Sequence, residues 1–334
     1  MNNFNKSSEK NRLLRSGKFV DITKYLPKGY VKNGTVDYTN YLQKALNENR
    51  KVIMPNFPIL INDIGLDIPS QTTVIFENSS KLLLSPSAKA NYELIRIHRK
   101  SDIVIFSPTI IGDRKNHRGN LGEWGMGISI KSSRNIVITN ANISDCWGDG
   151  VYIGQSLGIT NSNISLKYGL IDNNRRNGIS VISANGLTIQ NMVVSNTNGT
   201  APQAGIDFEP NANNEVLKNI TIKNVYTFNN NSQGIFYCLN KLNGGSDSVG
   251  IVVDTHLDNY SKGAIGIMNM APGRLSKESL KGRLVFRNIE GRNNRVHFRI
   301  FDKSDLDNMN IEVSPKVKTG FKMQGTSKNL ILSK

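Results

Sequence analysis

Apolar and polar residues alternate along short segments of this chain, and six of these segments begin with a glycine. In the first five, the first and third residues after the glycine are apolar, which is the two-residue period of a strand with one buried side. The segments are Gly127–Ile130, Gly150–Ile153, Gly178–Val181, Gly205–Phe208, Gly234–Tyr237 and a degenerate copy, Gly263–Ile267. Their glycines are 23, 28, 27, 29 and 29 residues apart. A strand that recurs at this interval predicts a solenoid of stacked coils.

A second series of apolar triplets keeps step with the glycine series. The triplets begin at Ile136, Leu157, Leu187, Ile220 and Ile251. The first four are each followed, after one further residue, by an asparagine: Asn140, Asn161, Asn191 and Asn224. Asparagine tolerates the left-handed backbone of a turn. We therefore expect these four residues to stack at one corner of the coil, in a structural rather than a chemical role.

The segments before and after the regular repeat are predicted to close its ends. Residues 1–20 are polar and basic and are interpreted as a flexible arm. Apolar residues at helical spacing, preceded by Asp37, predict a helix over 38–48. An open first coil would expose its core and strand edges, so this helix is expected to cover it. Residues 21–334 then form a single domain, in which 272–334 are the last coils and a basic C-terminal cap.

The composition bears on where the protein is expected to act. No run of 18 apolar residues occurs, so membrane insertion is not expected. No signal peptide is visible in the first 18 residues, and we expect a secreted or virion-associated protein that arrives by another route or as a trimmed form. Stacked strands lie about 4.8 Å apart, so Cys146 and Cys238, about three coils apart, are too distant for a disulfide.

The net charge is +16, and residues 262–334 contribute +9 of it, with 15 Lys or Arg against 6 Asp or Glu. A basic field favours an anionic partner such as an acidic polysaccharide, although solubility alone would also account for it. Nucleic acid is not expected as a partner, because no recognition-helix, zinc or RNA-binding motif is present.

Candidate catalytic residues lie where the alternation points side chains outward. The second and fourth residues after each glycine face out, and only one repeat places two carboxylates there, Asp207 and Glu209. Their backbones are expected about 6.6 Å apart on one face. Asp149, directly before Gly150, is a third candidate, with a turn cap as its structural alternative.

The loops that enter these strands carry acids, arginines and aromatic residues. This mixture suits a sugar-binding groove, because flat rings stack on sugars, carboxylates bind hydroxyls and arginines bind acidic groups. As structural alternatives, the tryptophans could cover the coil edge and the two arginines could pair with Asp172. The predicted substrate-binding residues are Glu123, Trp124, Asp145, Trp147, Tyr152, Arg175, Arg176 and His117, the last also a candidate base.

Three of these stretches, Cys146–Tyr152, Asn174–Ser180 and Ala204–Pro210, together with Val36–Gln43, carry a resemblance to a known superfamily. The chain resembles right-handed parallel β-helix proteins of the pectate-lyase-like superfamily, and in particular phage tailspike capsule depolymerases and related bacterial enzymes. The resemblance covers roughly residues 20–270. It implies an all-β parallel β-helix, a polysaccharide ligand and, along the tailspike branch, a homotrimer. The clustered aspartates that hold calcium in pectate lyases are not seen here, and no metal or cofactor is expected.

Three functions remain open at this point. The first is a glycosidase that cuts an acidic, capsular-type bacterial polysaccharide with Asp207 and Glu209 as acid and base. The second is a polysaccharide lyase acting by β-elimination beside a uronate, for which Arg175, Arg176, Lys131, Tyr152 and His117 supply candidates. The third is a non-catalytic polysaccharide-binding adhesin, since fold alone does not decide function.

Overall fold

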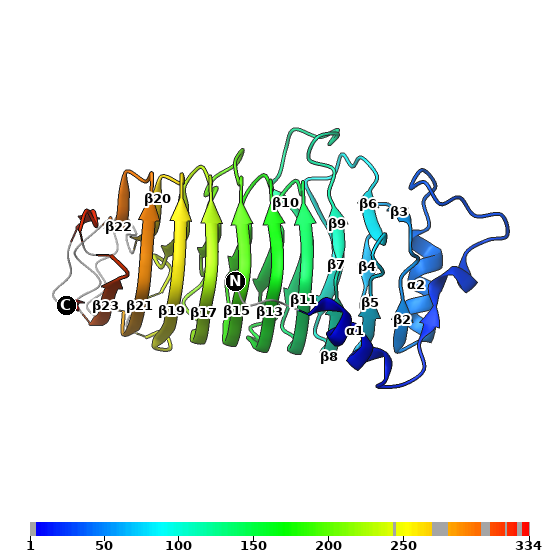
Figure 1. Ribbon diagram of the computed structural model, residues 1–334, viewed down its shortest axis with the longest axis horizontal. Helices are drawn as coiled ribbons and strands as arrows, with labels where there is room; N and C mark the ends of the chain where they lie inside the picture. The colour runs from blue at the N-terminus through cyan, green and yellow to red at the C-terminus, as the bar shows by residue number, and fades with distance from the viewer. Residues whose placement is uncertain are drawn as a thin grey trace.

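The protein forms an elongated rod of parallel strands that coil around one axis (Figure 1). The computed structural model describes residues 5–242, 245–268, 280–301, 308–317, 319–325 and 329–333. Nearly every strand pairs in parallel with the equivalent strand of the next coil, as in a β-helix. The predicted fold class, an all-β parallel β-helix with a helix at its N-terminal end, is confirmed.

The glycine segments build one side of the rod, a ten-stranded parallel sheet in the described part of the chain. Its strands follow one another without exception in sequence order, which confirms the predicted stacking. They are β4 (Leu66–Asp67), β7 (Asn91–His98), β10 (Trp124–Lys131), β12 (Val151–Gly154), β14 (Ile179–Val181), β16 (Ile206–Phe208), β18 (Gln233–Cys238), β20 (Gly263–Met268), β22 (Val296–Ile300) and β24 (Met323–Gln324).

The remaining sides of the rod belong to a fifteen-stranded sheet, counted over the same described residues. Its central strands are the long arrows in front in Figure 1. The strands are β1 (Val20–Asp21), β2 (Lys51–Ile53), β3 (Pro58–Ile61), β5 (Thr73–Ile75), β6 (Lys81–Leu84), β8 (Ser101–Phe106), β9 (Thr109–Ile111), β11 (Arg134–Ser144), β13 (Asn161–Asp172), β15 (Ala184–Ser195), β17 (Leu217–Phe228), β19 (Val249–Asn259), β21 (Gly282–Arg292), β23 (Met309–Pro315) and β25 (Leu330–Leu332).

The interior is a stack of apolar side chains aligned by strand register. In the ten-stranded sheet, the first apolar position of each glycine segment lies beside the same position of the next coil, as with Ile179, Ile206 and Ile235. All three are buried. The second apolar position stacks in the same way, and the rings of Phe208 and Tyr237 are parallel with centroids 4.8 Å apart. Equal coil spacing thus turns one sequence phrase into a continuous core.

The predicted asparagine corner is present, with one member misplaced. Asn140, Asn191 and Asn224 occupy equivalent positions inside long strands and have φ of 57°, 54° and 51°. The Nδ2 of Asn224 donates to Oδ1 of Asn191 at 2.6 Å, so the column is also hydrogen-bonded. The left-handed region strains most residues, and asparagine tolerates it better than most.

The prediction was wrong for Asn161. The corner position of that coil is Tyr168, which lies between Asn140 and Asn191 in register and has φ of 54°. The triplet that begins at Leu157 is not a strand but an exposed turn, with Leu157 80% exposed. Asn161 instead begins β13 and is fully buried, donating to the carbonyls of Gly154 and Ser183. The segment 157–159 has the apolar pattern of the repeat but does not lie at the equivalent position of the coil.

The N-terminal end of the core is covered by α2 (Thr39–Glu48), at the right of Figure 1, beside the short helix η1 (Ile22–Tyr25). Leu42, Ala45 and Leu46 are its buried apolar residues and join the main core. The Asp37 carboxylate accepts hydrogen bonds from the Thr39 backbone amide at 2.9 Å and from the Thr39 hydroxyl at 2.5 Å. The predicted helix and its role as a cover are therefore confirmed.

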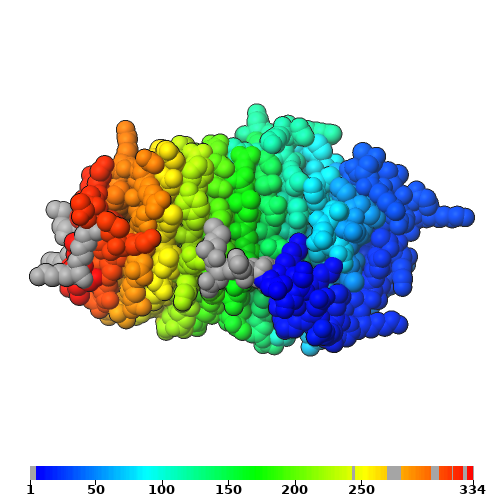
Figure 2. Space-filling model, in the orientation of Figure 1, coloured from blue at the N-terminus to red at the C-terminus, as the bar shows by residue number. Residues whose placement is uncertain are grey.

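The segment predicted as a flexible arm contains a helix, α1 (Lys6–Leu14). Leu13 of this helix is buried against Ile75 and Phe106, which lie on the outer side of β5 and β8. In the space-filling view, α1 is the dark blue patch against the side of the rod (Figure 2). The arm prediction missed this docking because Leu13 and Leu14 are a short apolar signal in a polar segment.

Several smaller expectations concern the ends and the cysteines. Part of the predicted C-terminal cap, residues 272–279, 302–307, 318, 326–328 and 334, lies outside the described residues. The strands β21 to β25 continue the coil through the described part. The domain boundary at residue 21 stays a prediction. Cys146 and Cys238 are both free, as predicted, and both are buried. No helix in the described part of the chain has the length and hydropathy to cross a membrane.

Replacing Ile206 with Asp tests the core register. The side chain is fully buried between Ile179 and Ile235, so an unpaired charge there should cost more than about 4 kcal/mol. We expect the circular dichroism melt to lose its cooperative transition or to shift down by many degrees. Thr221→Asp is the matched control, because Thr221 is exposed on β17. Equal melts for the two variants would contradict the register.

Candidate functional site

A single arginine gathers acids from three other segments. Arg176, in the turn between β13 and β14, has its Nη1 3.2 Å from Asp149 Oδ2 and its Nη2 2.6 Å from Glu209 Oε2. Its Nε lies 3.6 Å from Glu123 Oε2. The Asp149 side chain is fully buried, whereas Glu209 and Glu123 are 26% and 33% exposed. The structure therefore brings four of the predicted site residues together around one guanidinium.

Asn177 connects this cluster to Asp207. Its Nδ2 donates to Asp207 Oδ2 at 3.1 Å, and its backbone N–H donates to Asp149 Oδ1 at 3.0 Å. Its Oδ1 accepts from the Ala204 backbone N–H at 3.0 Å, which fixes the orientation of the amide. We did not predict this residue. A signal was present, since Asn177 directly precedes Gly178 just as Asp149 directly precedes Gly150.

Asp207 faces away from the core, as predicted, but it is not exposed. In register it lies between Ser180 and Phe236, outside the stack of Ile206 and Phe208. Its exposed fraction is 0%, and its Oδ1 is buried without a hydrogen-bond partner among the described residues. The alternation rule gives the direction of a side chain but not what the neighbouring loops place over it. Glu209 is the member of the pair that solvent reaches.

The surroundings of the cluster shift the pKa values of two of its acids and of Arg176. Burial raises the pKa of Asp207 well above its usual value, and the neighbouring Glu209 charge raises it further. Burial also raises the pKa of Asp149, although Arg176 opposes the shift. For Arg176 itself, burial alone would lower the pKa, but the charges of Asp149 and Glu209 outweigh it and the pKa is raised. Arg176 is thus a permanent cation beside two buried acids, Asp149 and Asp207, whose ionisation is disfavoured.

A second group of predicted residues forms a stack beside this cluster. The rings of Tyr92 and His117 have centroids 5.8 Å apart, and those of His117 and Trp147 are 4.0 Å apart. The Arg175 guanidinium lies 3.8 Å from the Trp147 ring centre. His117 Nδ1 is 2.8 Å from Asp113 Oδ2, and neither of these side chains is exposed.

The stack changes the interpretation of three candidates. Both faces of Trp147 are covered, so this ring offers no free face to a sugar and fits the structural alternative of a cover for the coil edge. His117 is buried and is not placed to act as a base on a bound polymer. Arg175 donates to the backbone carbonyls of Gly122 and Trp147 at 3.0 and 3.2 Å.

The other arginine expectations need correction too. We expected Arg175 and Arg176 to bind acidic groups of the substrate, or else to pair with Asp172. Arg176 is instead engaged by the cluster's own acids. The Asp172 carboxylate accepts from Ser195 and Asn196, both at 2.7 Å.

The remaining candidates lie apart from one another. Asp145 faces a turn, where its Oδ1 accepts from Asn173 at 2.7 Å and lies 3.5 Å from Lys115 Nζ. Trp124, next to Glu123, is 46% exposed and has the free ring that Trp147 lacks. Tyr152 stands on β12 with Lys131 Nζ 5.5 Å from its ring centre, and burial raises the pKa of Tyr152 to about 12.

The arrangement suits proton chemistry better than metal chemistry. The cluster sets Glu123, Asp149, Asp207 and Glu209 against one arginine. Burial, and for Asp207 the neighbouring acids as well, disfavours ionisation of Asp149 and Asp207, and acid–base catalysis uses carboxyls of this kind. Within the described part of the chain, no group of three or more His, Cys, Asp or Glu side chains is placed to hold a metal ion.

Comparison with known proteins agrees with this architecture. The family described as a right handed beta helix region matches residues 59–219. The chain is a right-handed parallel β-helix. It is 26% identical over 231 residues to the uncharacterized protein YclG of Bacillus subtilis (strain 168), and 29% identical over 167 residues to the SPbeta prophage-derived uncharacterized protein YorA of the same strain. These alignments cover 63% and 43% of this β-helix chain, but only 38% and 28% of the two relatives.

Solved structures share the β-helix at low sequence identity. The adhesin PfbA of Streptococcus pneumoniae superposes with a TM-score of 0.61 at 12% identity, over 93% of this chain and 97% of that one. The tailspike gp49 of Acinetobacter baumannii bacteriophage Fri1, a capsular polysaccharide depolymerase, gives 0.59 at 13% identity, over 95% and 64%. The mannuronan C-5 epimerase AlgE6 A-module of Azotobacter vinelandii gives 0.57 at 13% identity, over 93% and 88%.

Replacing Arg176 with Gln tests whether this side chain neutralises the cluster. In the folded wild-type protein, the pKa values of Asp149 and Asp207 are already above their unfolded values. Without the Arg176 cation, the folded-state pKa values of both acids should rise further. A raised folded pKa gives stability that is complete below the unfolded pKa and is lost as pH rises through the folded pKa. We therefore expect a loss of about 3–5 kcal/mol near pH 8 and a smaller loss near pH 4, measured by urea unfolding.

The matched control for that variant is Arg283→Gln, which removes an exposed arginine paired with Glu312 on the other sheet. It should change the free energy of unfolding little at either pH. A loss for Arg176→Gln that is the same at pH 4 and pH 8 would contradict the neutralising role.

Proposed function

We propose that this protein is a glycoside hydrolase that cuts a polysaccharide bound along its ten-stranded sheet. The observation that carries the proposal is the Arg176 cluster itself, in which partly exposed Glu209 is bound to Arg176 and buried Asp207 is held by Asn177. Hydrolysis of a glycosidic bond needs one protonated carboxyl and one ionised carboxylate on opposite sides of the bond. The cluster supplies carboxyls in both states.

Asp207 and Glu209 are the proposed source of the proton. The Glu209 charge acts on buried Asp207 and, after burial itself, is the main cause that raises the Asp207 pKa, so ionising both would set like charges against each other away from water. Asp207 is therefore the group of the pair that tends to keep a proton. Since Asp207 has no exposed surface, Glu209 is the catalytic acid that meets the glycosidic oxygen. Asp207 is a positioning residue whose raised pKa keeps a proton beside Glu209, and Asp149 helps to hold Arg176 and Asn177.

Glu123 is the proposed second carboxylate. It lies on the same guanidinium as Glu209 and is 33% exposed, so water and substrate can reach both. Because both acids contact one guanidinium, they are no further apart than the roughly 6.5–9.5 Å between the carboxyls of inverting enzymes. In the proposed inverting route, Glu123 activates the attacking water molecule. The exposed ring of Trp124 beside it offers a flat face for a sugar.

Fold similarity supports a polysaccharide as the ligand. The solved structures that superpose on the chain include a capsular polysaccharide depolymerase and a mannuronan epimerase. Their likeness is to the fold alone, so the choice of hydrolysis rests on the acids of this chain. With a phage tailspike and a surface adhesin also among the similar structures, we propose action outside the cell or on a virion.

Glu209→Gln is expected to lower turnover at least about a hundredfold, because the acid that assists the leaving group is lost. The measurement is release of reducing ends from a panel of capsular and pectic polysaccharides, first screened with the wild-type protein. Glu123→Gln should lose activity by a similar factor. Glu312→Gln, at a partly exposed acid of the fifteen-stranded sheet, is the matched control and should keep full activity.

Asp207→Asn separates positioning from a purely structural role. The raised pKa of Asp207 keeps a proton at the site, so losing this carboxyl should move the alkaline limb of the pH–rate profile to lower pH. A profile that falls in height but keeps its shape would contradict this role of Asp207.

The assay also distinguishes the two alternatives. Products with new ultraviolet absorbance would indicate a lyase, and binding without any size reduction would indicate an adhesin. The lyase has less support from the structure, because the guanidinium of Arg176 is already paired with internal acids and is not free to neutralise a uronate.

A further inference from the structure

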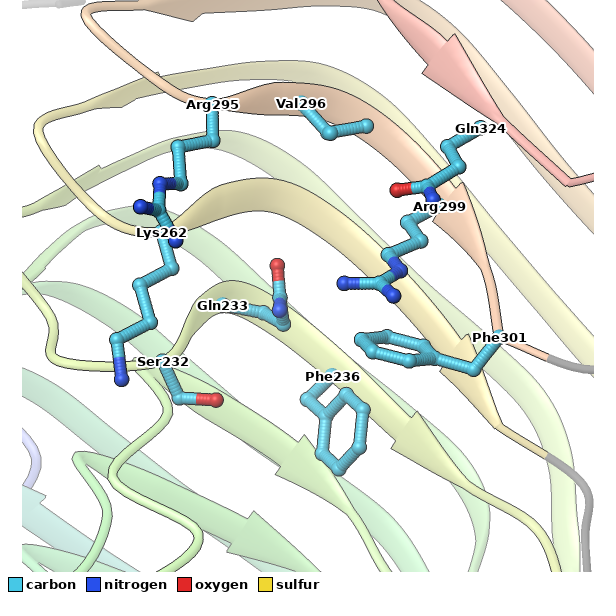
Figure 3. A pocket seen from close by; sticks show the side chains of 9 residues that line it. All are labelled: Ser232, Gln233, Phe236, Lys262, Arg295, Val296, Arg299, Phe301 and Gln324. Carbon is cyan, nitrogen blue, oxygen red and sulfur yellow. The ribbon is translucent and has the colours of Figure 1, made fainter.

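A cavity with no assigned role lies farther along the ten-stranded sheet, toward the C-terminal end (Figure 3). Its volume is about 520 Å³. The described residues that line it come from β18, β22, β24 and the segments next to these strands and β20. They are Ser232, Gln233, Phe236, Lys262, Arg295, Val296, Arg299, Phe301 and Gln324.

This lining has three cations and, within the described residues, no acid. Lys262 and Arg295 immediately precede Gly263 and Val296, which are paired across β20 and β22, so the two cations are neighbours on adjacent coils. No ion pair joins Lys262, Arg295 or Arg299 to an acid of the described chain. Three like charges around one cavity repel each other, and an anion held between them would remove that cost.

Arg299 is held in place by an aromatic contact, while one of its buried polar atoms has no hydrogen-bond partner among the described residues. Its guanidinium lies over the Phe301 ring, 4.0 Å from the ring centre, and Phe301 packs edge-on against Phe236 with centroids 6.0 Å apart. The Nε of Arg299 is buried and has no hydrogen-bond partner in the described structure. In Figure 3 the guanidinium points across the cavity toward the Gln233 side chain, whose Oε1 is also buried and unpartnered.

A glycine makes room for this arrangement. Gly266 lies between Phe236 and Arg299 in register, and a Cβ there would come within 2.9 Å of Gln233 and 3.1 Å of Phe301. Any larger residue would have to displace the groups that form the cavity. Buried polar atoms are normally hydrogen-bonded, so the open donor of Arg299 and the open acceptor of Gln233 point to a ligand with both an anionic and a hydroxyl group.

We infer that this cavity binds an anionic group, a carboxylate or a sulfate, on a sugar of the same polysaccharide chain whose cleavage is proposed above. The inference rests on that proposed function. Asp207, Phe236, Gly266 and Arg299 occupy one register column of the sheet. Three strand spacings separate the first from the last, about 14 Å. A polymer lying along the column would thus contact the acids at one end and Arg299 at the other, and an acidic polysaccharide is the substrate class selected.

Single-stranded nucleic acid is the rival ligand, because aromatic rings with cations also bind its bases and phosphates. The cavity fits it less well. The face of the Phe301 ring is covered by Arg299, and the Phe236 ring packs against its edge, so no pair of open rings is available for successive bases. An enclosed guanidinium opposite an amide suits one anionic group with an adjacent hydroxyl.

The test is affinity electrophoresis of the full chain in native gels that contain polygalacturonate, iota-carrageenan or neutral dextran, with a fluorescent oligo(dT) binding assay alongside. We expect one of the two acidic polymers to retard the protein and dextran not to do so. Polygalacturonate and carrageenan distinguish carboxylate from sulfate. Arg299→Gln should weaken that retardation about tenfold, the usual worth of one charge-assisted bond. Arg295→Gln, at an exposed position, is a second variant in case Arg299→Gln folds poorly.

Arg283→Gln is the matched control, since it removes the same charge from the other sheet and should change retardation less than about twofold. Equal losses for Arg283→Gln and Arg299→Gln would overturn the inference in favour of a diffuse basic field. Retardation by dextran alone or by no polymer, or oligo(dT) binding that depends on Arg299, would overturn it as well.

Glu209→Gln separates this inference from the proposed function, because it should abolish cleavage and leave retardation unchanged. Loss of cleavage in Glu209→Gln together with unaltered retardation in Arg299→Gln would support the proposed hydrolase and overturn the proposed binding role of the cavity. Retardation that depends on Arg299 without any cleavage by the wild-type protein would do the reverse.

Discussion

Every feature of this protein depends on the in-register hydrogen bonding of parallel strands from one coil to the next. The ladder fixes the spacing between coils, so residues at equivalent positions become neighbours whatever their distance in sequence. On the inside this alignment stacks Ile179, Ile206 and Ile235 into a continuous apolar core. On the outside it brings Ser180, Asp207 and Phe236 into one column. The same constraint that stabilises the rod therefore also assembles its candidate site.

The acidic cluster is costly to stability and is the part of the structure least explained by folding alone. Asp149 and Asp207 are fully buried, and the Oδ1 of Asp207 lacks a partner among the described residues. Burial of carboxyls is unfavourable unless a cation and hydrogen bonds compensate it. Arg176 and Asn177 supply the compensation in part, which leaves the pKa of Asp207 raised. A buried carboxyl with a raised pKa in a group of acids is typical of sites that transfer protons.

Charge is distributed along the rod in a way that the proposals use. The acids surround Arg176 at the middle coils. Lys262, Arg295 and Arg299, which have no ion pair with any described residue, lie farther toward the C-terminal end of the same sheet. A long anionic polymer would be attracted by the second region and cut at the first. Separating the two keeps the acids of the first region free of extra cations, which would lower their pKa values. The net charge of +16 is thus not spread evenly as a solubility device would be.

The sequence alone determined the coil, its interior and the identity of most acids in the cluster, because the glycine phrases repeat and alternation fixes which side faces out. It also indicated the helix over the first coil, through its spacing and Asp37. Only the tertiary structure decided what lies over each outward residue, since loops of neighbouring coils pack across the column. That is why Asp207 is covered, why Trp147 is enclosed between His117 and Arg175, and why Arg176 binds acids of its own chain. The cavity at Arg299 could not be predicted for the same reason, because its residues come from separate coils. Asn161 was assigned to the wrong position because an apolar pattern in the sequence does not show which residues pair between neighbouring strands.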